Sequence, residues 1–268
     1  MSIPTPSLSH LTAADFRCVY EPAEDTFVLL DALEQDQDAL RGEAPFRSYP
    51  DAQAQLTRSK AKRPRLCVEL GSGSGCVSTF IGKILGSHST AILSIDINPR
   101  AIDCTKRTGQ ANEVHLEPVL ANMLSSMRTR TTRTDKTEKH NEGSGTIDLL
   151  VFNPPYVPTP EEEEANAQST GDISGAWAGG LTGTRLVDEL IDGLSTSSDS
   201  PGTQAGIEHH LSPGAAFYLV AIRQNDPPAL VKRLQARGLE AEVVLQRRAG
   251  REHLFVIRAL NSNSMHAS

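Results

Sequence analysis

The sequence predicts an α/β fold in which a mostly parallel sheet is covered by helices on both faces. From residue 65 onward, short apolar runs alternate with segments of helical spacing, the pattern of a sheet built from strand–helix units. The first run leads into a glycine-rich turn at 71–75, which is typical of the ligand-binding end of such a sheet. The last two runs follow each other without an intervening helix, which predicts an antiparallel hairpin at one edge.

The N-terminal part precedes this alternating pattern. Residues 1–15 are expected to form a flexible tail. A helix should begin near Pro22, because proline and acidic residues favour a first helical turn and an apolar stretch at 27–33 follows. Residues 41–64 are polar and contain three prolines, so we interpret them as a linker.

Each later element follows from its local pattern. An apolar strand is expected wherever a short apolar run is bounded by turn residues, and a helix wherever apolar residues recur every three or four positions. The expected strands are 65–70, 91–95, 114–120, 147–152, 215–222, 240–246 and 253–258, and the expected helices cover 76–85, the residues after Pro99, 184–194 and 228–237.

We expect a single domain over residues 16–260, with a short tail at 261–268. Polar insertions interrupt it near 41–64, 125–145 and 195–206. The latter two contain almost no apolar side chains and therefore have the composition of disordered segments.

Composition excludes several classes of protein. No apolar run approaches the roughly 20 residues that span a bilayer, and the N-terminus lacks the pattern of a signal peptide. Four cysteines are scattered without a C-x-x-C pair, so neither a disulfide nor a metal site is expected. The net charge of -7 opposes binding of nucleic acid, and the basic stretch at 128–139 is best explained as a solvated loop. We expect a cytoplasmic location, with the nucleus as a second one.

One half of a site follows from the glycine turn. Glycines 71, 73 and 75 do not complete the dinucleotide pattern G-x-G-x-x-G, because Cys76 stands at the last position. Glu69, just before the turn, would repel a pyrophosphate but suits a cationic amino-acid ligand. Asp96 ends the second strand, where an acid can accept both hydroxyls of a ribose, although it could also cap the next helix. Asn122, after the third strand, suits an adenine edge or an ordinary turn.

The other half is the sequence Asn153-Pro154-Pro155-Tyr156 at the end of the fourth strand. Two prolines stiffen this loop and remove two N–H donors. The Asn153 side-chain carbonyl and the Pro154 backbone carbonyl can then accept both hydrogens of an NH2 group, while Tyr156 offers a flat face to a planar amide or base. Two acceptors orient a poorly nucleophilic nitrogen and stabilise the positive charge that develops on it during alkylation.

With both halves in place, the chain resembles the HemK/PrmC-type protein glutamine methyltransferases, specifically their eukaryotic and archaeal branch. The resemblance covers roughly residues 18–258 without the insertions. It is carried by the motifs YEPAEDT at 20–26, ELGSGSG at 69–75, DINP at 96–99, DLLVFNPPYV at 148–157 and AWAGG at 176–180.

This resemblance implies a seven-stranded, Rossmann-like class I methyltransferase fold. It also implies S-adenosylmethionine as cofactor and the glutamine of the Gly-Gly-Gln motif in the class I release factor as substrate. The residues implied to bind the cofactor are Thr26, Glu69, Gly71, Gly73, Asp96, Asn122, Met123 and Asn153, and those implied to bind the substrate are Asn153, Pro154, Pro155 and Tyr156. Asn122 departs from the family, which usually has Asp there.

The resemblance further implies a small zinc-binding activator subunit that lies along the edge of the third strand. In this chain that edge is formed by Val114, Leu116, Val119 and Leu120, near Ile102. An uncovered apolar edge favours association, so a partner is physically reasonable. Packing of the same residues beneath a neighbouring helix explains them equally well.

Some alternatives stay open at this point. An N6-adenine methyltransferase acting on DNA or RNA would present the same NH2 geometry to Asn153, but no basic, aromatic-rich recognition segment is evident. A protein lysine methyltransferase and a non-catalytic scaffold subunit are further alternatives. Trp177 is either a loop anchor or a wall of the substrate pocket. The acidic run at 161–164 is either a solvated loop or a contact for basic substrate.

Overall fold

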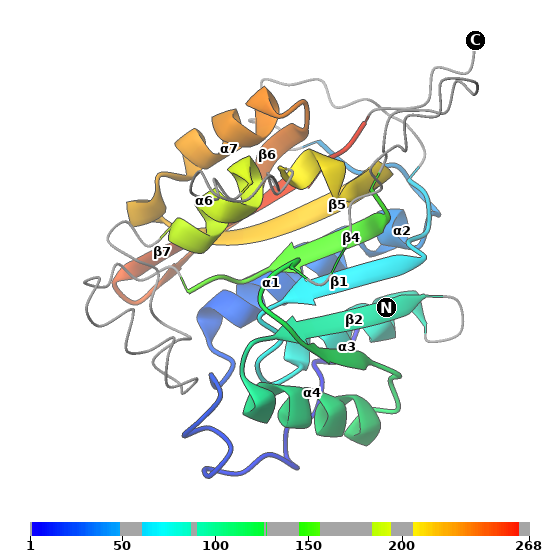
Figure 1. The fold of residues 1–268 in the computed structure, drawn as a ribbon, viewed down its shortest axis with the longest axis vertical. Helices are drawn as coiled ribbons and strands as arrows, with labels where there is room; N and C mark the ends of the chain where they lie inside the picture. The colour runs from blue at the N-terminus through cyan, green and yellow to red at the C-terminus, as the bar shows by residue number, and fades with distance from the viewer. Residues whose placement is uncertain are drawn as a thin grey trace, which may run out of the picture.

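The computed structural model describes residues 2–48, 61–86, 90–125, 127, 145–155, 184–193 and 206–262. Its seven-stranded sheet has the order β3-β2-β1-β4-β5-β7-β6 (Figure 1). The strands β1 to β5 run parallel to one another, and β7 pairs antiparallel with both β5 and β6. The predicted parallel sheet with an antiparallel hairpin at one edge is therefore confirmed. The strands are β1 (Leu66–Leu70), β2 (Ala91–Asp96), β3 (Glu117–Leu120), β4 (Ile147–Phe152), β5 (Leu211–Ile222), β6 (Glu240–Ala249) and β7 (Glu252–Leu260).

Helices cover both faces of this sheet (Figure 1). One face packs against α1 and α3, and the other against α6 and α7, each through a cluster of buried apolar side chains. The described helices are α1 (Glu24–Gln35), α2 (Gln37–Leu40), α3 (Cys76–Leu85), α4 (Pro99–Ala111), α6 (Arg185–Asp192) and α7 (Pro227–Ala236), with 3-10 turns η2 (Ile207–His209) and η3 (Arg223–Asn225). The short elements α2, η2 and η3 were not predicted, because a single turn leaves no periodic pattern.

The central strand β4 explains why the site lies where it does. All six of its residues are buried, as expected for a parallel strand covered on both faces. Its last residue, Phe152, pairs with Leu70 at the end of β1 and with Leu219 in β5, and Leu70 pairs with Ile95 near the end of β2. The loops that follow β1, β2 and β4 therefore emerge together at the carboxyl ends of the parallel strands.

The edge strand β3 is shorter than the predicted strand at 114–120. Val114 and Leu116 belong to the core instead, and each is 8% exposed. They fit because the helices above them carry glycines: a Cβ on Gly82 would lie 2.2 Å from Val114, and one on Gly109 would lie 3.0 Å from Leu116. These two residues are thus not free to form a partner surface, whereas Leu120 is 59% exposed.

The N-terminal segment also differs from its prediction as a flexible tail. Leu11 is buried in a small apolar cluster with Val19, Ala101 and Cys104. The Ser7 amide donates to Asn112 Oδ1 at 2.8 Å, and Asp15 forms an ion pair with Arg107 of α4. Residues 2–15 are therefore part of the folded domain, because a few apolar and charged side chains find partners on α4.

Several predicted features lie outside the described residues. These are most of the insertions, namely 49–60, 128–144 and 194–205, together with Tyr156, the acidic run at 161–164, Trp177 and residues 263–268. Within the described part of the chain, no helix has the length and apolarity that a membrane span requires. The same residues include no group of three or more histidines, cysteines or acids arranged to hold a metal.

Candidate active site

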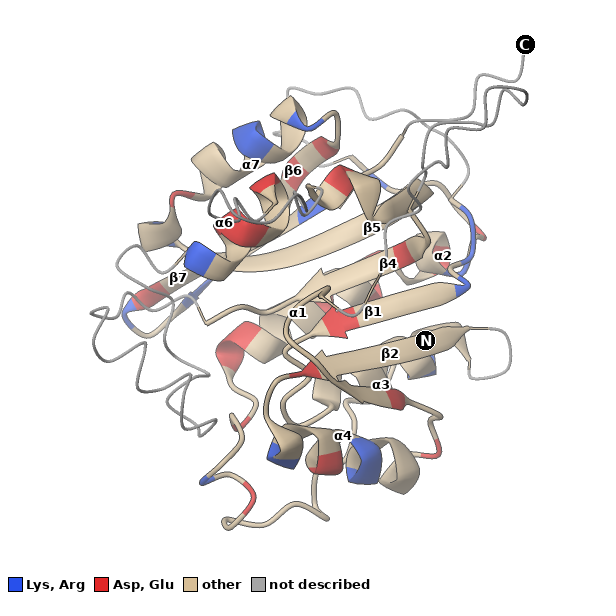
Figure 2. Cartoon of the chain, viewed as in Figure 1, with Lys and Arg blue, Asp and Glu red and all other residues tan. Residues whose placement is uncertain are grey.

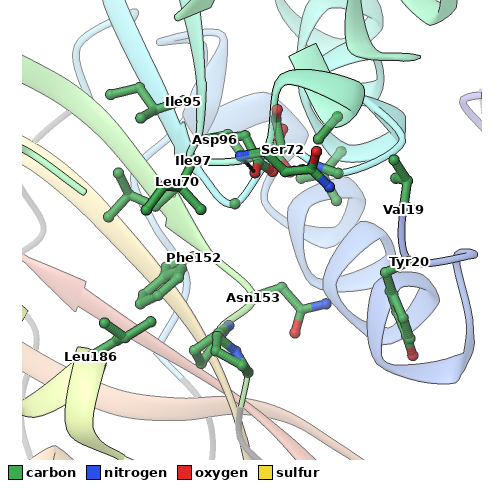
Figure 3. Close-up of a pocket in the computed structure, with 18 of the residues that line it drawn as sticks. Val19, Tyr20, Leu70, Ser72, Ile95, Asp96, Ile97, Phe152, Asn153 and Leu186 are labelled. Atoms are coloured by element: carbon green, nitrogen blue, oxygen red, sulfur yellow. Dashed lines mark hydrogen bonds between the residues drawn. The ribbon is translucent and has the colours of Figure 1, made fainter. Parts of the chain in front are cut away.

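A pocket of about 250 Å³ opens at the carboxyl ends of the parallel strands (Figure 3). Its walls come from the ends of β1, β2, β3 and β4, from the N-terminal segment before α1, and from α6. The predicted site residues that are described all line it: Thr26, Glu69, Gly71, Gly73, Asp96, Asn122, Met123, Asn153, Pro154 and Pro155. Both predicted halves of the site therefore belong to one cavity.

The floor of the pocket is the glycine turn between β1 and α3. Gly71, Gly73 and Gly75 have φ angles of 69°, 52° and 78°, in the left-handed region that favours glycine. Gly75 is also fixed by packing, since a Cβ there would lie 2.7 Å from the Thr105 Cα of α4. The turn thus brings the backbone and the start of α3 close to any ligand in the pocket.

Glu69 is a buried carboxyl group in the pocket wall, with 3% of its surface exposed. Its Oε2 accepts hydrogen bonds from the Ser78 backbone N–H at 2.9 Å and from the Ser78 hydroxyl, which in turn accepts from Ser94. Burial raises the pKa of Glu69 to about 8, although the bonds from Ser78 oppose the shift. The group is therefore mostly protonated at neutral pH, and a cation bound beside it would favour its ionised form.

Asp96 stands at the end of β2 and also lines the pocket. Its two oxygens accept the backbone N–H of Gly73 at 2.9 Å and of Asn98 at 2.8 Å, and burial raises its pKa. The cap of α4 is a different residue, Asn98, whose side chain accepts from the Arg100 amide. Since capping is explained by Asn98, the remaining acceptor capacity of Asp96 is available to hydroxyl groups of a ligand.

Asn122 and Met123 follow β3 and form another part of the wall. Met123 has a φ of 50°, which is uncommon outside glycine and turns the chain at the pocket. The preceding residue, Ala121, is tied to β2 by a hydrogen bond from its amide to the Asp96 carbonyl at 3.0 Å. The side chain of Asn122 is exposed beside the cavity, in keeping with its predicted ligand contact.

Asn153 connects the end of β4 to the N-terminal segment (Figure 3). Its Nδ2 donates to Asp25 Oδ2 at 2.9 Å, and the Tyr20 hydroxyl donates to the other oxygen of Asp25 at 3.0 Å. Asn153 Oδ1 is buried and has no hydrogen-bond partner among the described residues. Because buried acceptors are almost always paired, an unpaired one on a pocket wall indicates a place for a ligand donor.

Sequence reasoning missed several residues of the pocket. Val19 and Tyr20 come from the N-terminal segment and Asp25 from the first turn of α1. Arg185 and Glu189 form an ion pair at 2.5 Å on the α6 wall. Asp25 already had a local explanation as an acid in the first turn of a helix. The motif YEPAEDT was the available signal, since it was matched as a block without a role for its aspartate.

Relatives that match nearly the full length of this chain are known. No protein-family model matches the chain. Methyltransferase HEMK2 of Mus musculus is 36% identical over 257 residues, which is 96% of both chains, and HEMK2 of Homo sapiens is 35% identical over 258 residues, covering 96% of this chain and 97% of the human one. The eRF1 methyltransferase catalytic subunit mtq2 of Schizosaccharomyces pombe is 33% identical over 95% of this chain and 94% of its own.

Among solved structures, the fold is similar to that in the E. cuniculi Mtq2–Trm112 complex, which methylates the eRF1 translation termination factor. The TM-score is 0.54 and the identity 20%, over 91% of this chain and 99% of that one. This likeness supports the predicted class I methyltransferase fold. Near-full-length identity above 30% to three relatives then settles the classification: the chain is a methyltransferase and belongs to the HEMK2/Mtq2 family.

Proposed function

We propose that this protein transfers a methyl group from S-adenosylmethionine to the side-chain nitrogen of a glutamine, in the Gly-Gly-Gln motif of the class I translation termination factor. The observation that carries the proposal is the buried Oδ1 of Asn153 on the pocket wall, which is unpaired within the described structure. Such an atom calls for an N–H donor, and the amide of glutamine supplies one. The name of the S. pombe relative, an eRF1 methyltransferase subunit, supports the same substrate.

The pocket fits S-adenosylmethionine in three respects. The cofactor's amino-acid part carries an ammonium group, which suits Glu69, a carboxyl group that burial keeps mostly protonated until a cation is near. Its ribose suits Asp96, and its adenine suits Asn122 and Met123 near the end of β3. When bound, the cofactor supplies an electrophilic methyl group on a sulfonium.

The residues of the Asn-Pro-Pro loop act on the acceptor. Asn153 Oδ1 and the Pro154 carbonyl accept the two N–H groups of the glutamine amide, which directs the nitrogen at the methyl carbon. As the new N–C bond forms and the S–C bond breaks, the nitrogen becomes positively charged, and both carbonyl dipoles stabilise that charge. The nitrogen then loses a proton to water. No strong base is needed beforehand, because the amide nitrogen becomes acidic only as it is alkylated.

The substrate is tested by comparing methyl acceptors under identical conditions. The protein, purified with its activator subunit, is incubated with the release factor, with a release factor whose motif glutamine is replaced by alanine, with DNA and RNA oligonucleotides, and with a lysine-containing histone. We expect transfer only to the intact release factor, mapped by mass spectrometry to the motif glutamine. Faster transfer to adenine or lysine would contradict the proposal.

The role of Asn153 is tested with Asn153→Ala. We expect turnover to fall by about 10²–10³-fold, the typical effect of removing one such transition-state contact. The affinity for S-adenosylmethionine should fall much less, because Asn153 is only one of the residues expected to contact the cofactor. Gln110→Ala is the matched control, since it removes an exposed side-chain amide in α4, outside the pocket. Unchanged turnover in Asn153→Ala would reject the assignment.

We also propose that the protein works as a heterodimer with a small zinc-binding activator along β3. This is supported by the E. cuniculi relative, which is a complex with Trm112. In this chain β3 is an outer strand, and Leu120 and the nearby Ile97 are 59% and 58% exposed. Leu120→Asp should abolish co-purification with the activator, whereas Gln246→Asp on the opposite outer strand β6 should not. Retained binding in Leu120→Asp would exclude this edge.

A further inference from the structure

A three-residue chain of hydrogen bonds stands behind the proposed substrate contact. It runs from the Tyr20 hydroxyl to Asp25 Oδ1 at 3.0 Å and from Asn153 Nδ2 to Asp25 Oδ2 at 2.9 Å. Asp25 lies in the first turn of α1 and is 4% exposed, so its position is fixed by the surrounding protein. Asn153 and Asp25 are 128 residues apart in sequence and meet only in the folded protein.

This contact decides which end of the Asn153 amide faces the pocket. The two ends of an amide have nearly the same shape, so packing alone does not distinguish them. A carboxylate accepts hydrogen bonds and does not donate them, so only the NH2 end of Asn153 can face Asp25. The oxygen is consequently left on the other side, where no described residue pairs with it. A reversed amide would offer donors to the substrate nitrogen and repel its hydrogens.

We propose that Asp25 is a positioning residue that locks the orientation of the Asn153 amide, with Tyr20 holding the carboxylate from its far side. The proposal rests on the proposed function in that Asn153 Oδ1 is taken to accept from the substrate NH2. Asp25 need not touch the substrate itself. Asp25 holds the side-chain amide of Asn153 in the correct orientation before the substrate binds. None of the substrate's binding energy is then used to rotate that amide.

The test compares Asp25→Ala, Asp25→Asn and the double variant Asp25→Ala/Asn153→Ala in the full heterodimer. Asp25→Ala should lower kcat at least tenfold with little change in the KM for S-adenosylmethionine. Asp25→Asn should recover most of the activity, because its carbonyl oxygen can accept the same bond. The double variant should be no slower than Asn153→Ala alone, because Asp25 acts through Asn153.

Melting temperature and cofactor affinity are measured for every variant, and Tyr20→Phe provides a milder change with an expected loss of a few-fold in kcat. Multiplicative losses in the double variant, or no recovery in Asp25→Asn, would overturn the positioning role. The ratios are measured with whichever acceptor the wild type methylates. A release factor that is not methylated therefore counts against the proposed function, while the ratios still judge Asp25.

A second, independent observation concerns the hairpin between β6 and β7. Arg223, Arg248 and Arg251, here called the basic rim, are exposed and line one concavity together with Gln224, Glu252 and His253. No side chain of these three arginines has an ion-pair or hydrogen-bond partner among the described residues. By contrast, Arg185, Arg233, Arg237 and Arg247 are all paired with acids. In Figure 2 the ribbon near the tip of this hairpin is coloured blue for basic residues, beside a red acidic stretch.

The basic rim lies at the same end of the sheet as the active site, where the parallel strands have their carboxyl ends. Arg223 follows the last residue of β5, Ile222, which pairs with Leu254 of β7, and Arg248 pairs with His253 across the hairpin. β5 is the direct neighbour of β4, which ends at Asn153. Arg223 comes four residues after Leu219, the partner of Phe152. Because strands lie about 4.8 Å apart and rise about 3.3 Å per residue, the rim begins on the order of 10 Å from Asn153 and extends away from it.

We infer that the basic rim binds an acidic segment of the protein substrate beside the methylated loop, an inference that rests on a protein being the substrate. Three unpaired guanidinium groups around one hollow suit the carboxylates of such a segment. A nucleic acid is disfavoured, because the chain has a net charge of -7 and Glu252 interrupts the rim. Charge attraction at this distance would orient the substrate without touching the reacting atoms.

The test is the triple variant Arg223→Glu/Arg248→Glu/Arg251→Glu. For the intact release factor we expect KM to rise at least tenfold with unchanged kcat, and the wild-type advantage to shrink at high salt. A short Gly-Gly-Gln peptide should be methylated equally by both proteins. The control, Arg100→Glu/Lys106→Glu/Lys232→Glu, makes the same charge change at exposed residues elsewhere.

Each other outcome overturns the inference. An unchanged KM for the intact release factor would remove the rim from substrate binding. An equal loss with the short peptide would assign the effect to the pocket. An oligonucleotide that binds the wild type but not the triple variant would assign the rim to nucleic acid. If the release factor is not a substrate at all, the proposed function fails first, and the acceptor found by mass spectrometry takes its place in the assay.

Discussion

Two buried polar clusters in this protein have similar chemistry but different completeness. One joins Asp25 to Tyr20 and Asn153 beside the pocket. The other lies between the sheet and α1, where Arg258 bonds Asp36 and Glu242 at 2.6 Å each, and Tyr218 donates to Asp36 at 2.7 Å. Each contains a tyrosine-to-aspartate hydrogen bond, yet they differ in where their unpaired polar atom lies.

The Arg258 cluster is sealed from solvent, with one guanidinium group between two carboxylates. Arg258 is 0% exposed, its guanidinium also donates to the Arg47 carbonyl, and Phe46 lies over it at 5.0 Å. Its Nε, which has no partner among the described residues, borders neither described pocket, whereas the unpaired Oδ1 of Asn153 belongs to a residue of the pocket wall. A buried polar group alone is therefore weak evidence of function; an unpaired atom on a cavity wall is much stronger.

The largest effect should come from breaking the sealed cluster. Arg258→Met leaves the carboxylates of Asp36 and Glu242 buried without a cation, and the free energy of unfolding should fall by about 3–5 kcal/mol. Urea denaturation at fixed pH measures the loss. Arg247→Met, which breaks the half-exposed pair with Asp31, should cost only about 0–1 kcal/mol. Equal losses in the two variants would mean that the Arg258 cluster is not a structural core.

The next effect sharpens the contrast at the pocket. Asn153→Asp sets a carboxylate against Asp25, and two close carboxylates retain a shared proton to higher pH than usual. The ionised form should be about 10²-fold slower than wild type. When protonated, the introduced carboxyl group would donate to Asp25 and keep a free carbonyl, like the native amide. Turnover of this variant should therefore rise as the pH falls, while that of the wild type should not. A flat pH profile would contradict the assigned orientation.

The bounds of a helix or strand were predicted best where the residues of that element alone determine them. β4 and α3 were bounded correctly, since a mainly apolar run ends before Asn153 in one case and helical spacing ends before Gly86 in the other. The strand at 114–120 was drawn too long, because its apolarity reflects packing under helices that carry Gly82 and Gly109. Nothing near Asp25 reveals a partner 128 residues away.

The pocket residues divide in the same way. Glu69, Asp96 and Asn153 could be predicted because each lies within one residue of the carboxyl end of a strand, a position that topology alone makes a ligand site. Tyr20, Arg185 and Glu189 could not, because they reach the pocket from elements that flank the sheet. The final geometry of such walls depends on tertiary packing, which a local pattern does not encode.

A smaller effect concerns the buried carboxyl group of Glu69. Because its pKa is raised to about 8, binding a cationic cofactor must release its proton over most of the range below that pH. Cofactor affinity should therefore increase as the pH rises, by at most about tenfold per pH unit, and level off above roughly 8. Isothermal titration in buffers of different ionisation enthalpy measures both affinity and proton release. In Glu69→Gln the affinity should be weaker and this proton release absent; persistence of the release would assign it to another group.

The smallest expected effect is again on Glu69, and it distinguishes the contribution of a hydrogen bond to its pKa from the contribution of burial. Burial raises the pKa of Glu69 and the bonds from Ser78 lower it, so Ser78→Ala should move the midpoint of cofactor binding upward, by about one pH unit or less. The shift is limited because the Ser78 backbone N–H still donates at 2.9 Å. Thr79→Ala is the control, since its neighbouring hydroxyl is buried without a partner among the described residues and should leave the midpoint unchanged. A downward shift of this midpoint in Ser78→Ala would mean that Ser78 stabilises the protonated form of Glu69. The cofactor would then bind beside a different charge state of Glu69 from the one assigned here.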